Sequence, residues 1–248
     1  MISSETLFKA KRASALIATT LGYVPRRLRL ITSGYYHGAF RGKIFCIGRN
    51  KTGTTSLENL FRLLGYKVAN QWRSERLIYE ARFIPDGRFW RWVDSHQVFQ
   101  DSPFNTHWLL PELIHRYPNA RFILSVRARN EWLASLINHH AEHLNLTGSE
   151  SPDAVRQAML ADSYVGPGYW YSAFTKNHPH AATIHPYDSA SLLSDYDKYH
   201  KLVRTIIPVE QLLEIDISKE ADSNKIVEFL GLPPSFNVAM PKLNQRRG

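Results

Sequence analysis

A short loop at residues 48–56 combines two glycines, one lysine and four hydroxyl residues, a composition suited to binding an anion. It follows the apolar run 44–47 and precedes the amphipathic run 57–64, which predicts strand, loop and helix in that order. This arrangement directs backbone N–H groups and a helix N-terminus at a phosphate. We therefore expect a phosphate-containing ligand here; the alternative is an ordinary strand–turn–helix that contains Gly and Thr.

The loop comes close to the motif G-x-x-x-x-G-K-[ST], the P-loop that binds nucleoside triphosphates. Gly48 and Gly53 have the required spacing, but Thr54 stands where that motif has its lysine. The lysine stands at Lys51 instead. The loop thus keeps one positive charge but brings it to a different part of the ligand.

A second candidate group consists of Arg127 and Ser135. Arg127 directly follows the apolar run 121–126, and Ser135 lies two helical turns further along. Ligands of parallel sheets bind at the edge where the strands end, so Arg127 is expected near the loop at residues 48–56. A guanidinium and a hydroxyl that meet one phosphate form a common recognition pair. A surface salt bridge is the alternative reading of Arg127.

The elements that must position these residues alternate between strands and helices. Apolar runs predict strands at residues 43–48, 66–70, 97–101, 121–126 and 211–217. Helices are predicted at 54–64, 74–83, 108–117, 130–144 and 223–230, with a turn at 85–87 and a mainly helical stretch at 151–204. We therefore expect an α/β fold, a single-domain parallel sheet flanked by helices.

Composition limits the class of protein. The chain has 248 residues, of which 44% are hydrophobic and 12% aromatic, so it can form a folded core. One cysteine, Cys46, excludes a disulfide framework. The apolar stretch 13–24 is interrupted by polar residues and glycine and is too short to cross a bilayer, and no signal-cleavage pattern follows it. We expect a cytoplasmic protein.

Most of the net charge of +9 lies near the N-terminus. Residues 1–43 hold eight Lys or Arg and one acid, Glu5, so this segment carries +7 and the remainder +2. We predict a basic arm or helix at 1–42 ahead of one α/β domain at 43–248. A solvated basic helix packed on that domain is favoured over peripheral contact with an anionic surface. Without regularly spaced aromatics in the arm, we expect no nucleic-acid partner.

Together these groups resemble the sulfotransferases that use 3′-phosphoadenosine 5′-phosphosulfate (PAPS), most closely their bacterial and fungal sulfotransferase-like branch. The resemblance rests on residues 48–55 with Arg127 and Ser135, and extends to 101–104, 117–124, Trp132 and 229–233. It covers residues 43 to about 245. It implies a fold like that of the P-loop nucleotide hydrolases, PAPS as sulfuryl donor and adenosine 3′,5′-bisphosphate as product.

The resemblance also implies a role for each residue. The loop holds the 5′-phosphosulfate end of the donor, Lys51 lies at the bridging oxygen, and Arg127 with Ser135 binds the 3′-phosphate. A late basic loop would add Arg246 and Arg247, for which a frayed tail is the alternative. The predicted donor-binding residues are Arg49, Asn50, Lys51, Thr52, Gly53, Thr54, Thr55, Ser56, Arg127, Ser135, Arg246 and Arg247.

This sequence departs from the family at two positions. Many relatives have a histidine as general base after the third strand, whereas Asp101 stands there and could be partly desolvated by nearby aromatic residues. His107 is the competing base, and a site that uses neither is the third alternative. Relatives often stack adenine on a tryptophan where this chain has Ser56, so no adenine contact is predicted.

The expected reaction is metal-independent transfer of a sulfuryl group to a hydroxyl or amine of a small molecule, lipid or carbohydrate. A sulfuryl group carries less charge than a phosphoryl group, so Lys51 and N–H donors can stabilise the leaving phosphate. Residues 69–95 and 151–204 are expected to shape the acceptor pocket. His139 and His143 lie one helical turn apart but have no identifiable third ligand, so no metal site is predicted.

Two alternatives stay open at this point. In a P-loop kinase, Asp101 would bind magnesium, but the lysine that such an enzyme needs after Gly53 is missing. In a catalytically inactive nucleotide-binding scaffold, the loop would be retained without a working base.

Overall fold

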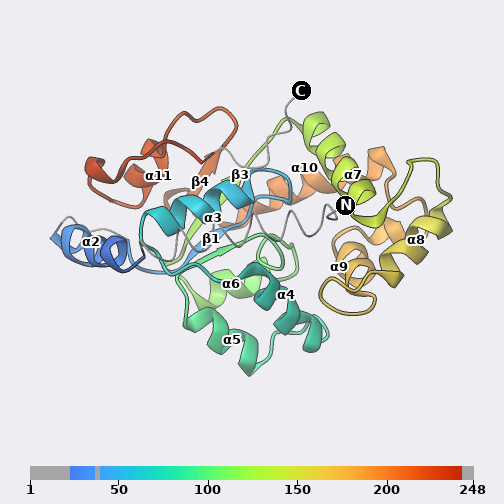
Figure 1. Ribbon diagram of the computed structural model, residues 1–248, viewed down its shortest axis with the longest axis horizontal. Helices are drawn as coiled ribbons and strands as arrows, with labels where there is room; N and C mark the ends of the chain where they lie inside the picture. The colour runs from blue at the N-terminus through green and yellow to red at the C-terminus, as the bar shows by residue number, and fades with distance from the viewer. Residues whose placement is uncertain (1–22, 37–39, 242–248) are drawn as a thin grey trace, which may run out of the picture.

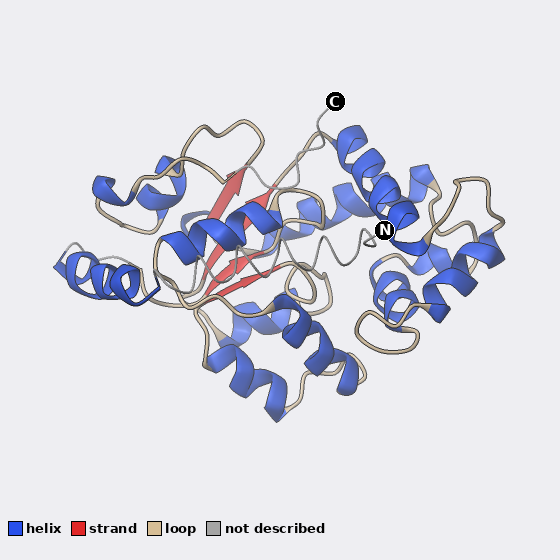
Figure 2. Cartoon of the chain, viewed as in Figure 1, coloured by secondary structure: helices blue, strands red, loops and turns tan. Residues whose placement is uncertain are grey.

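A four-stranded parallel sheet lies at the centre of the computed structural model, which describes residues 23–36 and 40–241 (Figures 1 and 2). The strands are β1 (Ile44–Cys46), β2 (Val98–Gln100), β3 (Arg121–Ser125) and β4 (Leu212–Ile215). Their order is β2-β1-β3-β4, and Phe45 of β1 pairs with Phe99 and Phe122 on either side. Because all strands run the same way, their carboxyl ends share one edge.

Helices surround this sheet, as predicted. They are α2 (Tyr23–Tyr36), α3 (Thr54–Leu63), α4 (Gln71–Glu80), α5 (Gly87–Asp94), α6 (Leu110–Arg116), α7 (Arg129–Leu144), α8 (Pro152–Ala161), α9 (Tyr169–Asn177), α10 (Ser189–Ile206) and α11 (Asn224–Phe229). Short 3₁₀ turns are η1 (Pro179–Ala182), η2 (Val209–Gln211) and η3 (Pro234–Phe236). None of the helices in the described ranges is both long and apolar enough to cross a membrane.

Both faces of the sheet are covered because side chains alternate along each strand. On one face, Ile44 and Cys46 pack with residues of α3 and α11. On the other, Phe45 and Ile47 pack with residues of α4, α5, α6 and α10. A third apolar cluster contains residues of α7, α8, α9 and α10, which lie beside the sheet on the right of Figure 1. Burial on both faces explains why the strands read as continuous apolar runs.

Two sequence-based predictions were wrong in this region. The strand predicted at 66–70 is reduced to one parallel bridge, between Val68 and Val98. The predicted turn at 85–87 is the start of α5, because the Asp86 carboxylate accepts hydrogen bonds from Arg88 N and Phe89 N and so caps a helix. Helix α5 then buries Phe89 and Val93 in the core.

Within the N-terminal segment the structure describes helix α2 and residues 40–42, and α2 projects at the left of Figure 1. Leu30 is buried, and Arg27 donates to the Gly65 carbonyl at 3.4 Å. A Cβ at Gly65 would lie 2.5 Å from the Arg26 carbonyl oxygen, so glycine is needed for α2 to pack this closely. The separation of residues 1–42 from a catalytic domain stays a prediction.

Candidate active site

The loop between β1 and α3 lies at the carboxyl edge of the sheet and packs directly on β3. A Cβ at Gly48 would lie 1.9 Å from Ser125 Oγ, so only glycine fits where the loop leaves β1. The Thr52 hydroxyl hydrogen-bonds Ser125 Oγ at 2.7 Å and the Arg49 carbonyl at 2.6 Å. The Thr52 hydroxyl therefore helps to close the loop over the sheet.

The loop then turns through two residues in the left-handed region, Lys51 with φ of 72° and Gly53 with φ of 100°. For a non-glycine residue this conformation costs about 1–2 kcal/mol, and such strain concentrates at functional sites. No side chain caps the start of α3. The first N–H groups of that helix, at Thr54 and Thr55, are thus oriented for an anionic ligand.

Asp101, at the end of β2, is tied to the start of α3. Its Oδ2 accepts a hydrogen bond from the Thr54 hydroxyl at 2.9 Å, and its Oδ1 accepts bonds from Ser102 N at 2.9 Å and Asn105 Nδ2 at 3.2 Å. Burial raises the pKa of Asp101, while these donors and the charge of Lys51 oppose the rise. The structure therefore brings together Lys51 and Asp101, two of the three predicted catalytic residues.

Asn105 and Tyr199 fix the first half of the loop. Asn105 Nδ2 donates to Asn50 Oδ1 at 2.8 Å, and Tyr199 OH donates to the Ile47 carbonyl at 2.8 Å. The buried Arg49 guanidinium lies 4.1 Å from the centre of the Tyr199 ring, and burial lowers its pKa. Arg49 thus leaves the loop toward α10.

Arg127 meets the loop from the end of β3, as the sheet topology predicts. Its Nη1 is 3.5 Å from the Lys51 carbonyl oxygen, and its Nε is 3.3 Å from Glu131 Oε2. The hydroxyl of Tyr196 donates to the Arg127 carbonyl at 2.9 Å and so orients the backbone. Arg127 therefore both pairs with Glu131 and lies near the loop, so the two expectations for this residue are compatible. Ser135 is half-buried further along α7.

Trp132 also anchors the loop, although the sequence suggested no role for it. Its indole Nε1 donates to the Asn50 carbonyl at 3.0 Å, and its ring packs 4.4 Å from that of Tyr196. Trp132 is 1% exposed, which makes this contact part of the core. Helices α7 and α10 thereby hold the loop from the side opposite β2.

The remaining predicted site residues differ in how exposed they are. His107 is exposed, and its pKa is lowered by partial desolvation and by the charges of Arg49 and Lys176, so it is neutral at pH 7. Thr55 is half-buried and Ser56 is buried at the start of α3. Arg246 and Arg247 lie outside the described residues.

Glu75, on α4, is a candidate that the sequence analysis missed. It is 4% exposed, and burial together with the charge of Asp101 raises its pKa to about 8. Hydrogen bonding by Gln71, Tyr169 and Tyr164 opposes the rise. The signal was present, because helical spacing puts Glu75 on the same buried face as Leu77 and Ile78.

A carboxyl group near another carboxyl group in a buried site is typical of acid–base chemistry. Tyr169 OH lies 3.3 Å from Ser102 Oγ, so the end of β2, α4 and α9 converge here. The arrangement combines an anion-binding loop, a lysine within it and a buried pair of carboxyl groups at one edge of the sheet.

Comparison with known proteins agrees with this geometry. No curated protein matches the chain significantly. The model of the sulfotransferase domain matches residues 43–248, which include the loop, Asp101 and Arg127. This match favours a sulfotransferase over the two alternatives considered from the sequence, a P-loop kinase and a non-enzymatic scaffold. The chain belongs to the sulfotransferase family and is a transferase enzyme.

Proposed function

We propose that this enzyme transfers the sulfuryl group of PAPS to a hydroxyl or amine of a small molecule, lipid or carbohydrate acceptor, without a metal. The observation that carries the proposal is the loop itself, where Lys51 is held in the left-handed region beside the uncapped start of α3. The 5′-phosphosulfate would lie in this loop. Arg127, whose guanidinium reaches the loop at Lys51, would bind the 3′-phosphate with Ser135.

In the proposed reaction the acceptor oxygen or nitrogen attacks sulfur while the bond from sulfur to the bridging oxygen breaks. Adenosine 3′,5′-bisphosphate leaves with the bonding electron pair, and the acceptor proton passes to a base. Negative charge grows on the bridging oxygen, where Lys51 and the N–H groups of α3 stabilise it. Asp101 and Glu75 supply the base as a pair, since the charge of one acts on the pKa of the other.

A shallow aromatic pocket of about 410 Å³ supports an acceptor with an apolar part. Phe83, Trp90, Trp108 and Lys176 are among its lining residues. The Phe83 ring stacks on Tyr169 with centroids 6.1 Å apart, and Tyr169 contacts Ser102 beside Asp101. Tyr169 and Ser102 therefore connect this pocket to the proposed base Asp101.

Two further proposals rest on the sequence. We place the enzyme in the cytoplasm, because its single cysteine suits a reducing compartment. The basic arm at residues 1–42 is proposed to pack on the catalytic domain through α2, with contact to an anionic surface as the other role.

Donor class can be tested by calorimetry. Adenosine 3′,5′-bisphosphate is expected to bind at least ten-fold more tightly than ATP with magnesium, because the site has Arg127 for a 3′-phosphate and no lysine after Gly53. Sulfate transfer from PAPS to a panel of phenols, alcohols and amino sugars should survive excess EDTA. Tighter binding of ATP–magnesium would contradict the proposed donor.

Arg127→Ala is expected to weaken binding of adenosine 3′,5′-bisphosphate by about 10- to 100-fold, the size of one charge-assisted contact. Binding of adenosine 5′-monophosphate should change less than three-fold, because that nucleotide has no 3′-phosphate. Arg129→Ala is a matched control, since Arg129 pairs with Asp197 at 3.1 Å. Equal weakening of both nucleotides in Arg127→Ala would refute the 3′-phosphate assignment.

The pH dependence of kcat/KM should reveal the carboxyl pair. A base works when ionised, and a raised pKa postpones ionisation, so activity is expected to rise with pH and to show a limb near the Glu75 pKa of about 8. Ionisation of Glu75 also strengthens Asp101 as a base. Glu75→Gln should keep measurable turnover at pH 7 and lose this limb; a limb that persists belongs to another group.

A further inference from the structure

A second cluster of ionisable side chains lies where α9 gives way to η1. His178 directly follows α9, Pro179 begins η1, and His180 comes next, so two imidazoles are placed two residues apart. Both face α10, where Asp195 Oδ2 lies 3.0 Å from His178 Nδ1 and 3.3 Å from His180 Nδ1. Within the described ranges, these three residues form the one group of His, Cys, Asp and Glu with this convergence, their ligand atoms all within 4.8 Å of one another.

Both ring nitrogens of His180 face acceptor oxygens. Its Nε2 lies 3.3 Å from the Pro186 carbonyl oxygen, and its Nδ1 lies 3.3 Å from the Asp195 carboxylate. Both neighbours are acceptors, but a neutral imidazole carries one N–H. If Nε2 donates to Pro186, the Nδ1 lone pair faces a carboxylate oxygen. A proton or a metal ion between them would satisfy both atoms.

The second imidazole favours a metal ion. His178 is 6% exposed, and its Nδ1 lies 3.0 Å from the same Asp195 oxygen that His180 approaches. The Asp195 carboxylate is 19% exposed, and its Oδ2 faces both imidazoles. Two imidazoles and one carboxylate are a ligand set that zinc uses in proteins.

We propose that His178, His180 and Asp195 bind a divalent first-row transition-metal ion, with Zn²⁺ as the best match. With metal–ligand bonds of about 2.0–2.1 Å, neighbouring ligands of a tetrahedral zinc ion are about 3.3 Å apart. The two observed separations of 3.0 and 3.3 Å agree with that spacing. The Pro186 carbonyl supplies the outer contact that typically orients a metal-binding histidine, and the fourth position is left for water.

The ion would have a structural role distinct from sulfuryl transfer. Asp195 lies one helical turn before Tyr199. The Tyr199 hydroxyl donates a hydrogen bond to the Ile47 carbonyl, and the Arg49 guanidinium lies over the Tyr199 ring. Linking Asp195 to η1 therefore braces the part of α10 that supports the phosphate loop. The charge of Arg49 acts on Asp195 and His178 and opposes a second cation, so affinity must come from the three ligands themselves.

A metal titration tests the proposal. Protein without a histidine tag, dialysed against EDTA and then metal-free buffer at pH 7.5, is titrated with Co²⁺ by visible absorption and with Zn²⁺ by calorimetry. We expect one ion per chain. His180→Ala and Asp195→Asn should each weaken binding at least about 100-fold, since loss of even an outer-shell partner costs 10- to 100-fold. Zn²⁺ should raise the melting temperature of the wild type but not that of His180→Ala.

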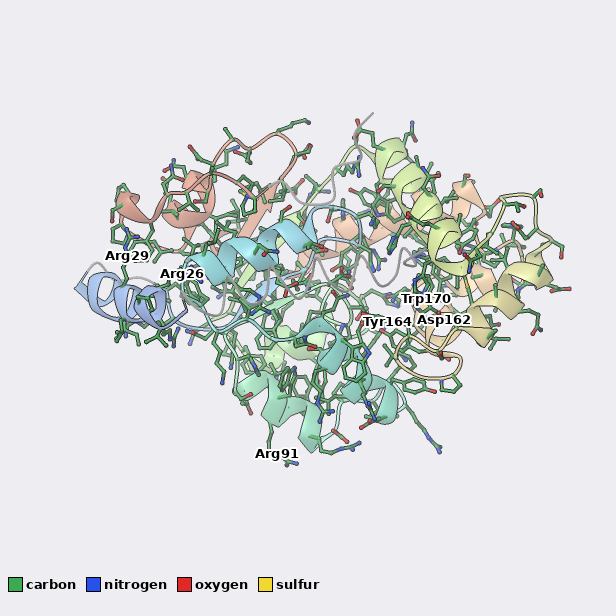
Figure 3. All side chains as sticks on the ribbon, viewed as in Figure 1. Arg26, Arg29, Arg91, Asp162, Tyr164 and Trp170 are labelled. Carbon is green, nitrogen blue, oxygen red and sulfur yellow. The ribbon has the colours of Figure 1, made fainter. Side chains whose placement is uncertain are left out.

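A second histidine–aspartate pair provides the control. His143 Nε2 lies 3.0 Å from Asp162 Oδ2, and the His143 ring stacks on Trp170 at 4.4 Å. Figure 3 shows Asp162, Tyr164 and Trp170 close together in the right half of the view. This pair has one imidazole, so His143→Ala should leave the metal affinity unchanged. Circular dichroism shows whether each variant is folded. Wild-type binding no tighter than that of folded His180→Ala would overturn the proposal and assign the contacts to an imidazolium–carboxylate pair.

Discussion

Lys51→Ala is expected to lower kcat for sulfuryl transfer by about 100- to 1,000-fold, the usual effect of removing one group that stabilises charge in a transition state. The charge on the bridging oxygen develops only as its bond to sulfur breaks, so the ammonium of Lys51 acts mainly on the transition state. The dissociation constant for adenosine 3′,5′-bisphosphate should therefore change less than ten-fold. Product release from PAPS with the best acceptor of the panel measures kcat, and calorimetry measures binding.

Lys51→Arg is the matched variant for this prediction. It keeps the positive charge and the left-handed backbone, but its planar guanidinium replaces a compact ammonium. Turnover between those of the wild type and Lys51→Ala is expected. If Lys51→Ala instead weakened product binding strongly and left kcat unchanged, Lys51 would be a binding residue and not the group that assists departure of the nucleotide.

The loop and the sheet could be predicted from the sequence because each depends on contiguous residues. The run 44–47, the glycines at 48 and 53 and the amphipathic run after them specify β1, the turn and α3 without reference to the rest of the chain. The parallel order of the strands then follows from the alternation of strands and helices. It brings Arg127 to the loop, where its Nη1 reaches the Lys51 carbonyl.

The supports of the loop could not be predicted in this way, because they join residues far apart in the chain. Trp132 is 82 positions from Asn50, and Tyr199 is 152 positions from Ile47. Local periodicity identifies each as a helical core residue and carries no sign of the carbonyl that it binds. The same holds for Glu75, whose pKa is raised by burial and by the charge of Asp101 at the end of β2.

Asp101→Asn is expected to lower turnover at least about 1,000-fold while leaving nucleotide binding within a factor of three. Asparagine has the same shape and tolerates the left-handed conformation that Asp101 adopts, with φ of 62°. The Thr54 hydroxyl can reverse its hydrogen bond and accept from the new amide, so the link between β2 and α3 can persist. What is lost is the charge, and with it the ability to take the acceptor proton.

Thermal unfolding separates this chemical role from a structural one. Because burial raises the pKa of Asp101, ionisation of this group costs folding free energy at neutral pH, where the unfolded chain holds it as a solvated carboxylate. Asp101→Asn removes that cost, so its melting temperature at pH 7 should not fall below that of the wild type.

His107→Gln tests the competing base. His107 is exposed and makes its electrostatic contacts with Arg49, Asp195 and Lys176, so its substitution is expected to change turnover by less than about three-fold. The reverse result, an active Asp101→Asn and an inactive His107→Gln, would move the proton transfer to the exposed side of the loop. It would also leave Asp101 with one task, holding Thr54 at the start of the helix that receives the donor phosphate.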